Sequence, residues 1–567
     1  MHFFERIIDG RKYRVAAQSI WNPQKRQPIS RQVVLGPADP PPLVDLRKTR
    51  TIGTRRMGDI GALIWVAEQL DIVRIINEAC AWTPTVGGPS IGELTVAVAV
   101  QRACQPGPKR DLSKFLAGSV PRISCLPAKA FSGQTFYRAA REISGEQVEQ
   151  AQVAIAKAAV ERFDLSTDVL AFDSTNFDTF IATTTKSELS KRAHAKSKRA
   201  DLRVVGLGVL VSETGHVPLL HRTYPGNGSD QALLESCLGG LRQLHEELNN
   251  VEDRPRAKRT VVRDGGFWSE QLEFDLEEAG YHSIISLPLS HNAAEAALIE
   301  AAKRGRMKRL TGSLKHVRAA RMMADVGDLT RTLVVVESKE LLRGQRRGIA
   351  VALRKARAGL KQLERRLATQ EAKGGKRLNL AAVQAKVDKL LRREHLSEFV
   401  VTKISGSDAH PTLSWRVDSD LRRKLERTRL GKRVLCTDHQ MWGTERIVRG
   451  FRGQWQVEDL FRQAKKGGLV PWGPSHQWAD TSLRLHTFAT VLGLTLVALA
   501  KLALKTKKSS RAMMKDLAEI RPTLVRSSSG EKGRRPTIML APELTAMQRK
   551  AVRIFELNRW ASTHFFN

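Results

Sequence analysis

The stretch Val169-Leu-Ala-Phe-Asp173 is a short apolar run that ends in a carboxylate, and the pattern that continues from it decides the fold. Leu202 to Val211 and His216 to Tyr224 have the composition of two further strands, and Gln231 to Leu248 has the period of a helix. A second apolar run, Thr260-Val-Val-Arg-Asp264, again ends in aspartate. Strands and helices in this order predict an α/β core with a mixed sheet.

A long insertion interrupts this core. Residues 290–430 contain short strands and two basic segments of helical period, Gly348 to Glu371 and Leu380 to Arg393, which predict a helical hairpin. The apolar run Lys432 to Cys436 then indicates the return to the core. The core is therefore predicted in two parts on either side of the insertion.

The segments before the core differ from it in pattern. An Asp9-Gly10 turn between two strand-like runs predicts a hairpin, and residues 55–162 have mostly helical periodicity. Helix pairs joined by short turns are compatible with a helix-turn-helix DNA reader and equally with a plain helical bundle. We predict six segments: a β unit over 1–45, a helical and possibly DNA-binding domain over 46–165, core parts over 166–289 and 431–508, the insertion over 290–430, and a basic tail over 509–567.

Composition points to a polyanionic partner. The 567 residues include 94 Lys and Arg against 58 Asp and Glu, a formal net charge of +36. An excess this large on a globular protein favours binding to the phosphates of DNA or RNA. An anionic membrane is the competing partner, but the basic residues are spread along the chain rather than gathered on one amphipathic helix.

No sequence feature indicates secretion or a membrane. The five cysteines are far apart, which predicts neither a disulfide framework nor a zinc site and fits a reducing cytosol. The N-terminus has no basic start followed by an apolar stretch, so we expect no signal peptide. The apolar stretch Leu485 to Ala500 is shorter than the roughly 20 residues of a membrane span and predicts a buried helix. We expect a soluble, cytoplasmic protein.

Near the C-terminus, Phe451 to Lys466 has the period of a helix that stops at Gly467-Gly468. Glu458 and Lys465 are two helical turns apart, so we expect their side chains to point the same way. The carboxylate can hold a hard metal ion and the lysine can contact a phosphate. Taken alone, this segment is better explained as a surface helix with ordinary charges.

Three carboxylates together favour a metal site. Asp173 and Asp264 each close an apolar strand, and Glu458 lies on a helix that must pack against the same sheet. Two aspartates and a glutamate can hold two Mg²⁺ ions roughly 3.5–4 Å apart, one activating the attacking oxygen and one stabilising the leaving oxygen. Strand-end aspartates are also common turn formers. Asp168 precedes the first strand and Asp178 is expected beyond its end, so we prefer Asp173.

The arrangement resembles the DDE transposases of bacterial insertion sequences, which have an RNase H-like core. Within them it is similar to the branch with a Tyr-x2-Arg-x3-Glu-x6-Lys signature, whose Glu and Lys correspond to Glu458 and Lys465. Phe451 and Gln454 stand at the Tyr and Arg positions. Phe172-Asp173-Ser-Thr resembles the first-aspartate strand, and Val262-Arg-Asp264-Gly-Gly-Phe-Trp-Ser resembles the second.

The resemblance implies a Mg²⁺-dependent transposase, with Mn²⁺ able to substitute. Such an enzyme hydrolyses one strand at each transposon end and joins the freed 3′-hydroxyl to target DNA. Its partners would be double-stranded DNA, as terminal inverted repeats and target, and a second copy in a synaptic homodimer in the bacterial nucleoid.

Other sequence features leave alternatives open. Gln454 lacks the guanidinium of the signature Arg, and Arg452, Arg462 and Lys466 are candidate additional DNA contacts beside Lys465. The basic run from Lys191 to Arg203 fits phosphate contacts and a solvated loop equally. Two other functions stay open: an RNase H-like nuclease or resolvase without strand transfer, and a non-catalytic nucleic-acid-binding protein.

Overall fold

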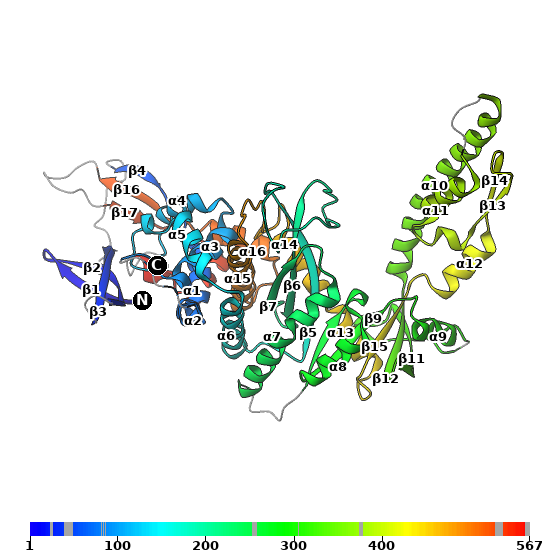
Figure 1. The fold of residues 1–567 in the computed structure, drawn as a ribbon. Helices are drawn as coiled ribbons and strands as arrows, with labels where there is room; N and C mark the ends of the chain where they lie inside the picture. Colours follow the sequence, from blue (N-terminus) through cyan, green and yellow to red (C-terminus); the bar gives the residue numbers. More distant parts are fainter. Residues whose placement is uncertain are drawn as a thin grey trace. The chain divides into compact units, whose positions relative to one another are not determined.

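The computed structural model describes residues 1–22, 27–38, 49–80, 82, 84, 87–251, 258–303, 305–373, 378–527 and 537–561. The chain forms two compact units (Figure 1). The first contains Met1–Val262, Gln271–Tyr281 and Gly453–Asn567, and the second contains Arg263–Glu270 and His282–Arg452.

The first unit begins with the predicted β hairpin. β1 (His2–Ile8) and β2 (Arg11–Asn22) pair antiparallel, and β3 (Gln27–Pro37) adds a third strand. The turn residues Asp9 and Gly10 have φ of 48° and 74°, the left-handed conformation that a two-residue hairpin turn requires. The prediction of this hairpin is confirmed.

A helical bundle follows, and one C-terminal helix runs through it. α15 (Asp480–Leu504) is buried along most of its length. It packs against four helices of the N-terminal part, α1 (Gly58–Gln69), α3 (Ile91–Cys104), α5 (Gly133–Glu142) and α6 (Gly145–Phe163). α15 is long and apolar enough for a membrane span, but 78% of its apolar window is buried within the protein. The prediction of a buried helix over 485–500 is confirmed.

Burial also decides the role of α3. Its side chains from Ile91 to Ala103 are all buried, with α2 (Ile72–Ala79), α4 (Leu112–Ala117) and α15 among its neighbours. A recognition helix must expose one face to a groove of DNA. α3 is therefore part of a bundle and cannot read DNA.

The mixed sheet predicted from the sequence lies in this unit. β5 (Val169–Thr179), β6 (Arg203–Ser212) and β7 (Pro218–Pro225) pair antiparallel in chain order, and β8 (Arg259–Arg263) pairs parallel on the other side of β5. α7 (Asp230–Val251) connects β7 to β8, and α8 (Glu270–Glu278) follows β8. Counted from β5, the strand order is 4-1-2-3, as in an RNase H-like core. The predicted α/β class is confirmed.

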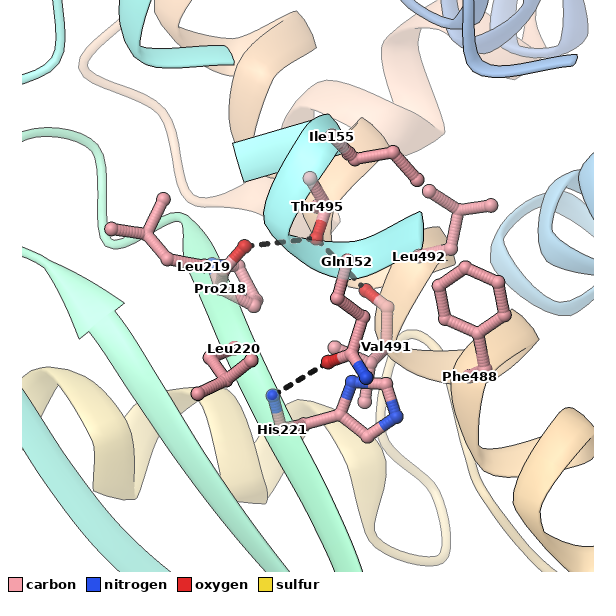
Figure 2. A pocket seen from close by; sticks show the side chains of 10 residues that line it. All are labelled: Gln152, Ile155, Pro218, Leu219, Leu220, His221, Phe488, Val491, Leu492 and Thr495. Carbon is pink, nitrogen blue, oxygen red and sulfur yellow. Dashed lines mark hydrogen bonds between the residues drawn. The ribbon is translucent and has the colours of Figure 1, made fainter. Parts of the chain in front are cut away.

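A small cavity lies where β7 meets α6 and α15 (Figure 2). The backbone N–H of His221 donates to Gln152 Oε1 (2.7 Å), and the Thr495 hydroxyl donates to the Pro218 carbonyl (3.5 Å). Burial and the nearby Arg222 lower the pKa of His221 to about 3, so this imidazole is neutral. Among the described residues that line the cavity, none is a predicted catalytic residue. The cavity belongs to the core packing.

The segment predicted to be a basic tail is folded where the structure describes it. It contains α16 (Ser510–Ala518), β16 (Thr523–Ser527), β17 (Thr537–Leu540) and α17 (Ala546–Ile554). β16 pairs with β4 (Thr49–Thr54) from the N-terminal part, and Trp560 is fully buried. Apolar burial outweighs the local positive charge here. The six predicted domain boundaries stay predictions.

The second unit contains an antiparallel sheet. β9 (Tyr281–Leu287) pairs with β15 (Lys432–Thr437), followed in order by β12 (Leu329–Ser338), β11 (Val317–Val326) and β10 (Lys308–Arg309). α9 (Asn292–Ala301) packs against β11, β12 and β15, and α13 (Thr444–Arg452) against β12. The short strands predicted within the insertion include β11 and β12, and this prediction is confirmed.

The predicted helical hairpin is also confirmed. α10 (Lys339–Lys373) packs against α11 (Leu380–Leu391), with β13 (Val400–Gly406), β14 (Pro411–Val417) and α12 (Ser419–Thr428) beside them (Figure 1). These elements share a hydrophobic cluster of their own, in which Leu360 and Val383 are fully buried. The insertion thus has an internal core that holds its long helix in place.

Leu360→Ala should destabilise this hairpin by about 2–5 kcal/mol, because it removes a fully buried side chain and leaves a cavity. Hydrogen exchange of α10 amides, followed by mass spectrometry, measures the local effect. Gln362→Ala, at an exposed position of the same helix, is the control and should change exchange little. Equal exchange in the two variants would contradict the assignment of Leu360 to the core.

Candidate active site

Asp173 lies in the middle of β5, where one of its neighbouring strands ends. β8 pairs with β5 as far as Ala171, opposite Val262, whereas β6 pairs with β5 to Thr179. The Asp173 carboxylate is half-buried, and its Oδ1 accepts a hydrogen bond from the Ser174 amide (2.7 Å). Ligands of α/β sheets bind beyond the carboxyl ends of parallel strands. Asp173 occupies that position relative to the β5–β8 pair.

The predicted end of this strand at Asp173 is wrong. β5 continues to Thr179 because residues 174–179 pair with β6 and because Phe177 is buried in a stack with Trp472 (ring centroids 5.0 Å apart). Asp178 is therefore inside the strand, where it accepts a hydrogen bond from the Ser197 hydroxyl (2.8 Å). This contact gives Asp178 a structural role and leaves Asp173 as the stronger candidate.

Glu458 lies in the first turn of α14 (Trp455–Ala464), which packs against β5 and β6. Val457, Leu460 and Phe461 are the buried side of the helix, and Glu458 is exposed. Free backbone N–H groups at a helix N-terminus favour a carboxylate at this position. The helix thus presents Glu458 to solvent next to the strand that carries Asp173.

The predicted single helix over 451–466 is wrong at both ends. α13 ends at Arg452 and α14 starts at Trp455, since Gly453 is a poor helix former. α14 ends at Ala464, and Lys465 is extended (φ −80°, ψ 170°). The amide of Trp472 donates to the Ala464 carbonyl (2.7 Å), so the following segment takes over the last hydrogen bonds of the helix. Because Lys465 lies outside the helix, the helical period does not determine where its side chain points.

Tertiary structure nevertheless brings Lys465 within range of the charge of Asp173. Partial burial and the charge of Lys196 lower the pKa of Lys465, and the charge of Asp173 opposes that shift. Lys196 Nζ donates to the carbonyl of Ser174, the residue after Asp173 (2.6 Å). The ammonium groups of Lys465 and Lys196 therefore lie within range of the charge of Asp173, an arrangement that can hold a phosphate near this carboxylate.

Lys196 is a residue that sequence reasoning left undecided. Asn176 of β5 holds the segment around it, because its Nδ2 donates to the His194 carbonyl and its Oδ1 accepts from the Lys196 amide (both 3.0 Å). The exposed Lys196 side chain is thus attached to β5 at two points. The only sequence signal was the basic run, whose irregular pattern did not distinguish Lys196 from its neighbours.

Asp264 belongs to the second unit and directly follows β8. Its side chain is 58% exposed and lies 3.9 Å from Arg433 Nη1, a surface ion pair worth little in stability. A Cβ on Gly265 would come within 2.5 Å of the Ser286 carbonyl. Gly265 thus allows the close approach of the chain's own strand β9.

Comparison with protein families identifies the chain. A family model described as "Transposase DDE domain" matches residues 164–472, more than half of the sequence and the span from β5 to the segment after α14. The chain belongs to the DDE-domain transposases. It is a DNA transposase, and its reaction is metal-dependent phosphoryl transfer on DNA.

Two further comparisons add little. The search of curated proteins finds no significant match. Among solved structures, the chain is similar to the piggyBac transposase in a synaptic complex with hairpin DNA, at a TM-score of 0.36 and 11% identity, covering 82% of this chain and 81% of that one. A likeness at that level carries no argument about mechanism.

The other basic residues predicted to contact DNA differ in their surroundings. Arg462 is exposed and ion-paired to Asp459 (3.0 Å), and Lys466 is exposed just after α14. Arg452, in the second unit, lies 3.3 Å from His316 Nε2. Phe451, at the position of the signature Tyr, is buried beneath the Arg433 guanidinium (5.7 Å). Of these residues, Lys466 is the one with an exposed ammonium next to the Lys465 site.

Divalent metal ions are general to this family, and carboxylate oxygens are the ligands that hard cations prefer. Within the described part of the chain, no three His, Cys, Asp or Glu side chains form a metal-binding group. Asp173 and Glu458 belong to the first unit and Asp264 to the second. The donor chemistry of the three residues fits a hard divalent cation, but neither unit alone contains all of them.

Replacing Lys196 by Met should raise the pKa of Lys465, since the charge of Lys196 is one cause of its lowering. Asp173→Asn should lower that pKa further, because the charge of Asp173 opposes the shift. NMR titration of ¹³Cε-labelled lysine follows Lys465 directly, and Lys465→Met assigns its signal. Lys191→Met, in the same segment, serves as the control. Shifts of the same sign in the Lys196 and Asp173 variants would contradict the arrangement.

Proposed function

We propose that Asp173, Asp264 and Glu458 are the catalytic carboxylates of this transposase and together bind its divalent metal ions. The main support for this proposal is the pairing register of β5 and β8. Ala171 of β5 and Val262 of β8 are partners in a parallel pair, and each aspartate follows its member of the pair by two residues. Glu458 adds the third carboxylate from a helix packed against β5. Family membership supports the same assignment.

The metal is proposed to be Mg²⁺, as two ions, with Mn²⁺ able to substitute. When bound, such ions activate an attacking oxygen and stabilise a leaving oxygen during phosphoryl transfer. Lys465 and Lys196 hold the phosphate beside Asp173, with Lys466, Arg462 and Arg452 as further DNA contacts. The hydrogen bond from Lys196 to the Ser174 carbonyl orients its ammonium and leaves two N–H donors for phosphate oxygens.

The chain is further proposed to come from a bacterial insertion sequence of the Tyr-Arg-Glu-Lys branch. Glu458 and Lys465 have the spacing of that signature, and Phe451 and Gln454 depart from it. Its partners would be the terminal inverted repeats, target DNA and a second copy of the chain in a synaptic homodimer, at the nucleoid of the cytoplasm. Of these, DNA binding has the strongest support, because the charge of +36 needs a polyanion.

Asp173→Asn, Asp264→Asn and Glu458→Gln should each reduce Mg²⁺-dependent cleavage by about 1,000-fold or more, since each removes a metal ligand that stabilises the transition state. The substrate is a plasmid carrying the DNA that flanks the gene, and strand cleavage is read on gels. Asp168→Asn is the matched control: it lies before the same strand and should retain activity. The affinity for DNA, measured in EDTA, should stay within about threefold of the wild-type value in all four variants.

The same assay separates the alternative functions. Joined product with an unrelated target plasmid supports strand transfer. Cleavage without joined product would favour a nuclease or resolvase. A wild-type chain that binds DNA but shows no Mg²⁺-dependent cleavage would favour the non-catalytic function and contradict the proposal.

A further inference from the structure

The long helix of the insertion has a strongly uneven charge distribution. Between Lys339 and Thr369, α10 has many arginines and lysines and only two acidic residues, Glu340 and Glu364. Four of the basic residues recur at intervals of seven, seven and four, which places them along one line of the helix. We call Arg347, Arg354, Lys361 and Arg365 the outer stripe, and all four are exposed.

The outer stripe lies on the side of α10 away from the insertion core. The buried side of the helix is a second line, which includes Leu353, Leu360 and Leu367. At 100° per residue the mean directions of the two lines are about 125° apart around the helix axis. From Arg347 to Arg365 the stripe extends about 27 Å at 1.5 Å per residue. It is a straight row of cations on a single helix.

Within the described part of the chain, these four cations form no ion pair, unlike other arginines nearby. Arg343 pairs with Glu340 (3.6 Å) and Arg346 with Glu426 (2.7 Å). Among the residues that the structure describes, no carboxylate forms an ion pair with any member of the outer stripe. A row of uncompensated like charges is unfavourable for the isolated protein, because the charges repel one another.

The row is also held rigidly. Gly359 of α10 approaches Leu390 of α11 so closely that a Cβ there would come within 2.5 Å of the leucine side chain. Asn379 caps α11 through a hydrogen bond from the Ala382 amide (2.9 Å). Together with the hydrophobic cluster that packs against α10, these contacts keep the cations in one line. A rigid row of this kind suits a stiff partner more than a flexible one.

We propose that the outer stripe binds the phosphate backbone of double-stranded DNA, as a contact additional to the catalytic residues. Its length of about 27 Å corresponds to roughly eight base pairs at 3.4 Å per pair. α10 has no aromatic residue, so it lacks the stacking platforms with which proteins hold single strands. Its apolar side is buried in the insertion core, so it has no apolar face for insertion into a membrane. The binding is sequence-independent, because phosphate contacts do not read bases.

The test compares two fourfold variants with the same loss of charge. The first is Arg347→Gln, Arg354→Gln, Lys361→Gln and Arg365→Gln. The control is Arg343→Gln, Arg346→Gln, Arg422→Gln and Arg423→Gln, which removes four arginines of the same region that pair with Glu340, Glu426 and Asp420. Glutamine has nearly the helix propensity of arginine and lysine, so both variants should keep their helices and unfold like the wild type.

Binding of the full chain to a labelled 30-base-pair duplex of mixed sequence is measured in EDTA between about 50 and 200 mM salt. The stripe variant should lose at least about tenfold in affinity at 100 mM salt. The magnitude of its slope of log K against log salt should fall by about 3.6, which is about 0.9 for each of the four lost phosphate contacts. The control variant should change the slope by less than about 1.

Three outcomes would overturn the proposal. The first is an equal loss of affinity in the control variant, which would make net charge the cause. The second is an equal loss of affinity for a single strand of the same sequence, and the third is no loss of affinity in the stripe variant. A duplex with the DNA that flanks the gene serves as a second probe. Equal loss on both duplexes supports a sequence-independent contact. Because the assay contains no metal, it is independent of whether Asp173, Asp264 and Glu458 are catalytic.

Discussion

The candidate site depends on the unequal pairing of one strand. β5 pairs with β6 along its whole length but with β8 only as far as Ala171. Hydrogen bonds to β6 hold β5 on one side. On the other side, the carboxyl end of the parallel β5–β8 pair stays available for ligands. Asp173 lies just past this point, and its half-buried carboxylate belongs to a strand that cannot move without disrupting the sheet. The site therefore takes its rigidity from backbone hydrogen bonds.

The positive charge at the site comes from chain segments without regular periodicity. Lys465 follows the end of α14, and Lys196 lies on the irregular segment between β5 and β6. Each is positioned by contacts to regular structure: the fold-back of Trp472 onto Ala464 for the first, and the side chain of Asn176 for the second. Loops on a rigid scaffold often carry functional residues for this reason. Burial and the charge of Lys196 lower the pKa of Lys465, and a bound phosphate would stabilise the charged form of this lysine.

The insertion places charge by a different principle. α10 is regular and its core is internal, so its basic residues form a line set by helical geometry rather than by tertiary contacts. The two kinds of basic site suit different tasks. The lysines near Asp173 can hold one phosphate group, whereas a straight row of cations fits the repeating phosphates of a duplex.

Much of this architecture was predictable from sequence periodicity. Local patterns that burial reinforces are present in the hairpin at Asp9-Gly10, in the strand that contains Asp173, in the strand that precedes Asp264, and in the α10–α11 hairpin. The end of β5, the end of α14 and the folding of residues 509–527 and 537–561 were not predictable. Each is decided by a distant partner: β6 and Trp472 for β5, the returning 470–472 segment for α14, and β4 for the C-terminal strand.

The sequence by itself determined which residues are candidates for metal and phosphate binding, because the strand and helix periods that mark their positions are local. Only the tertiary structure decided that Lys196 joins Lys465 beside Asp173, because that proximity comes from contacts between segments far apart in the chain.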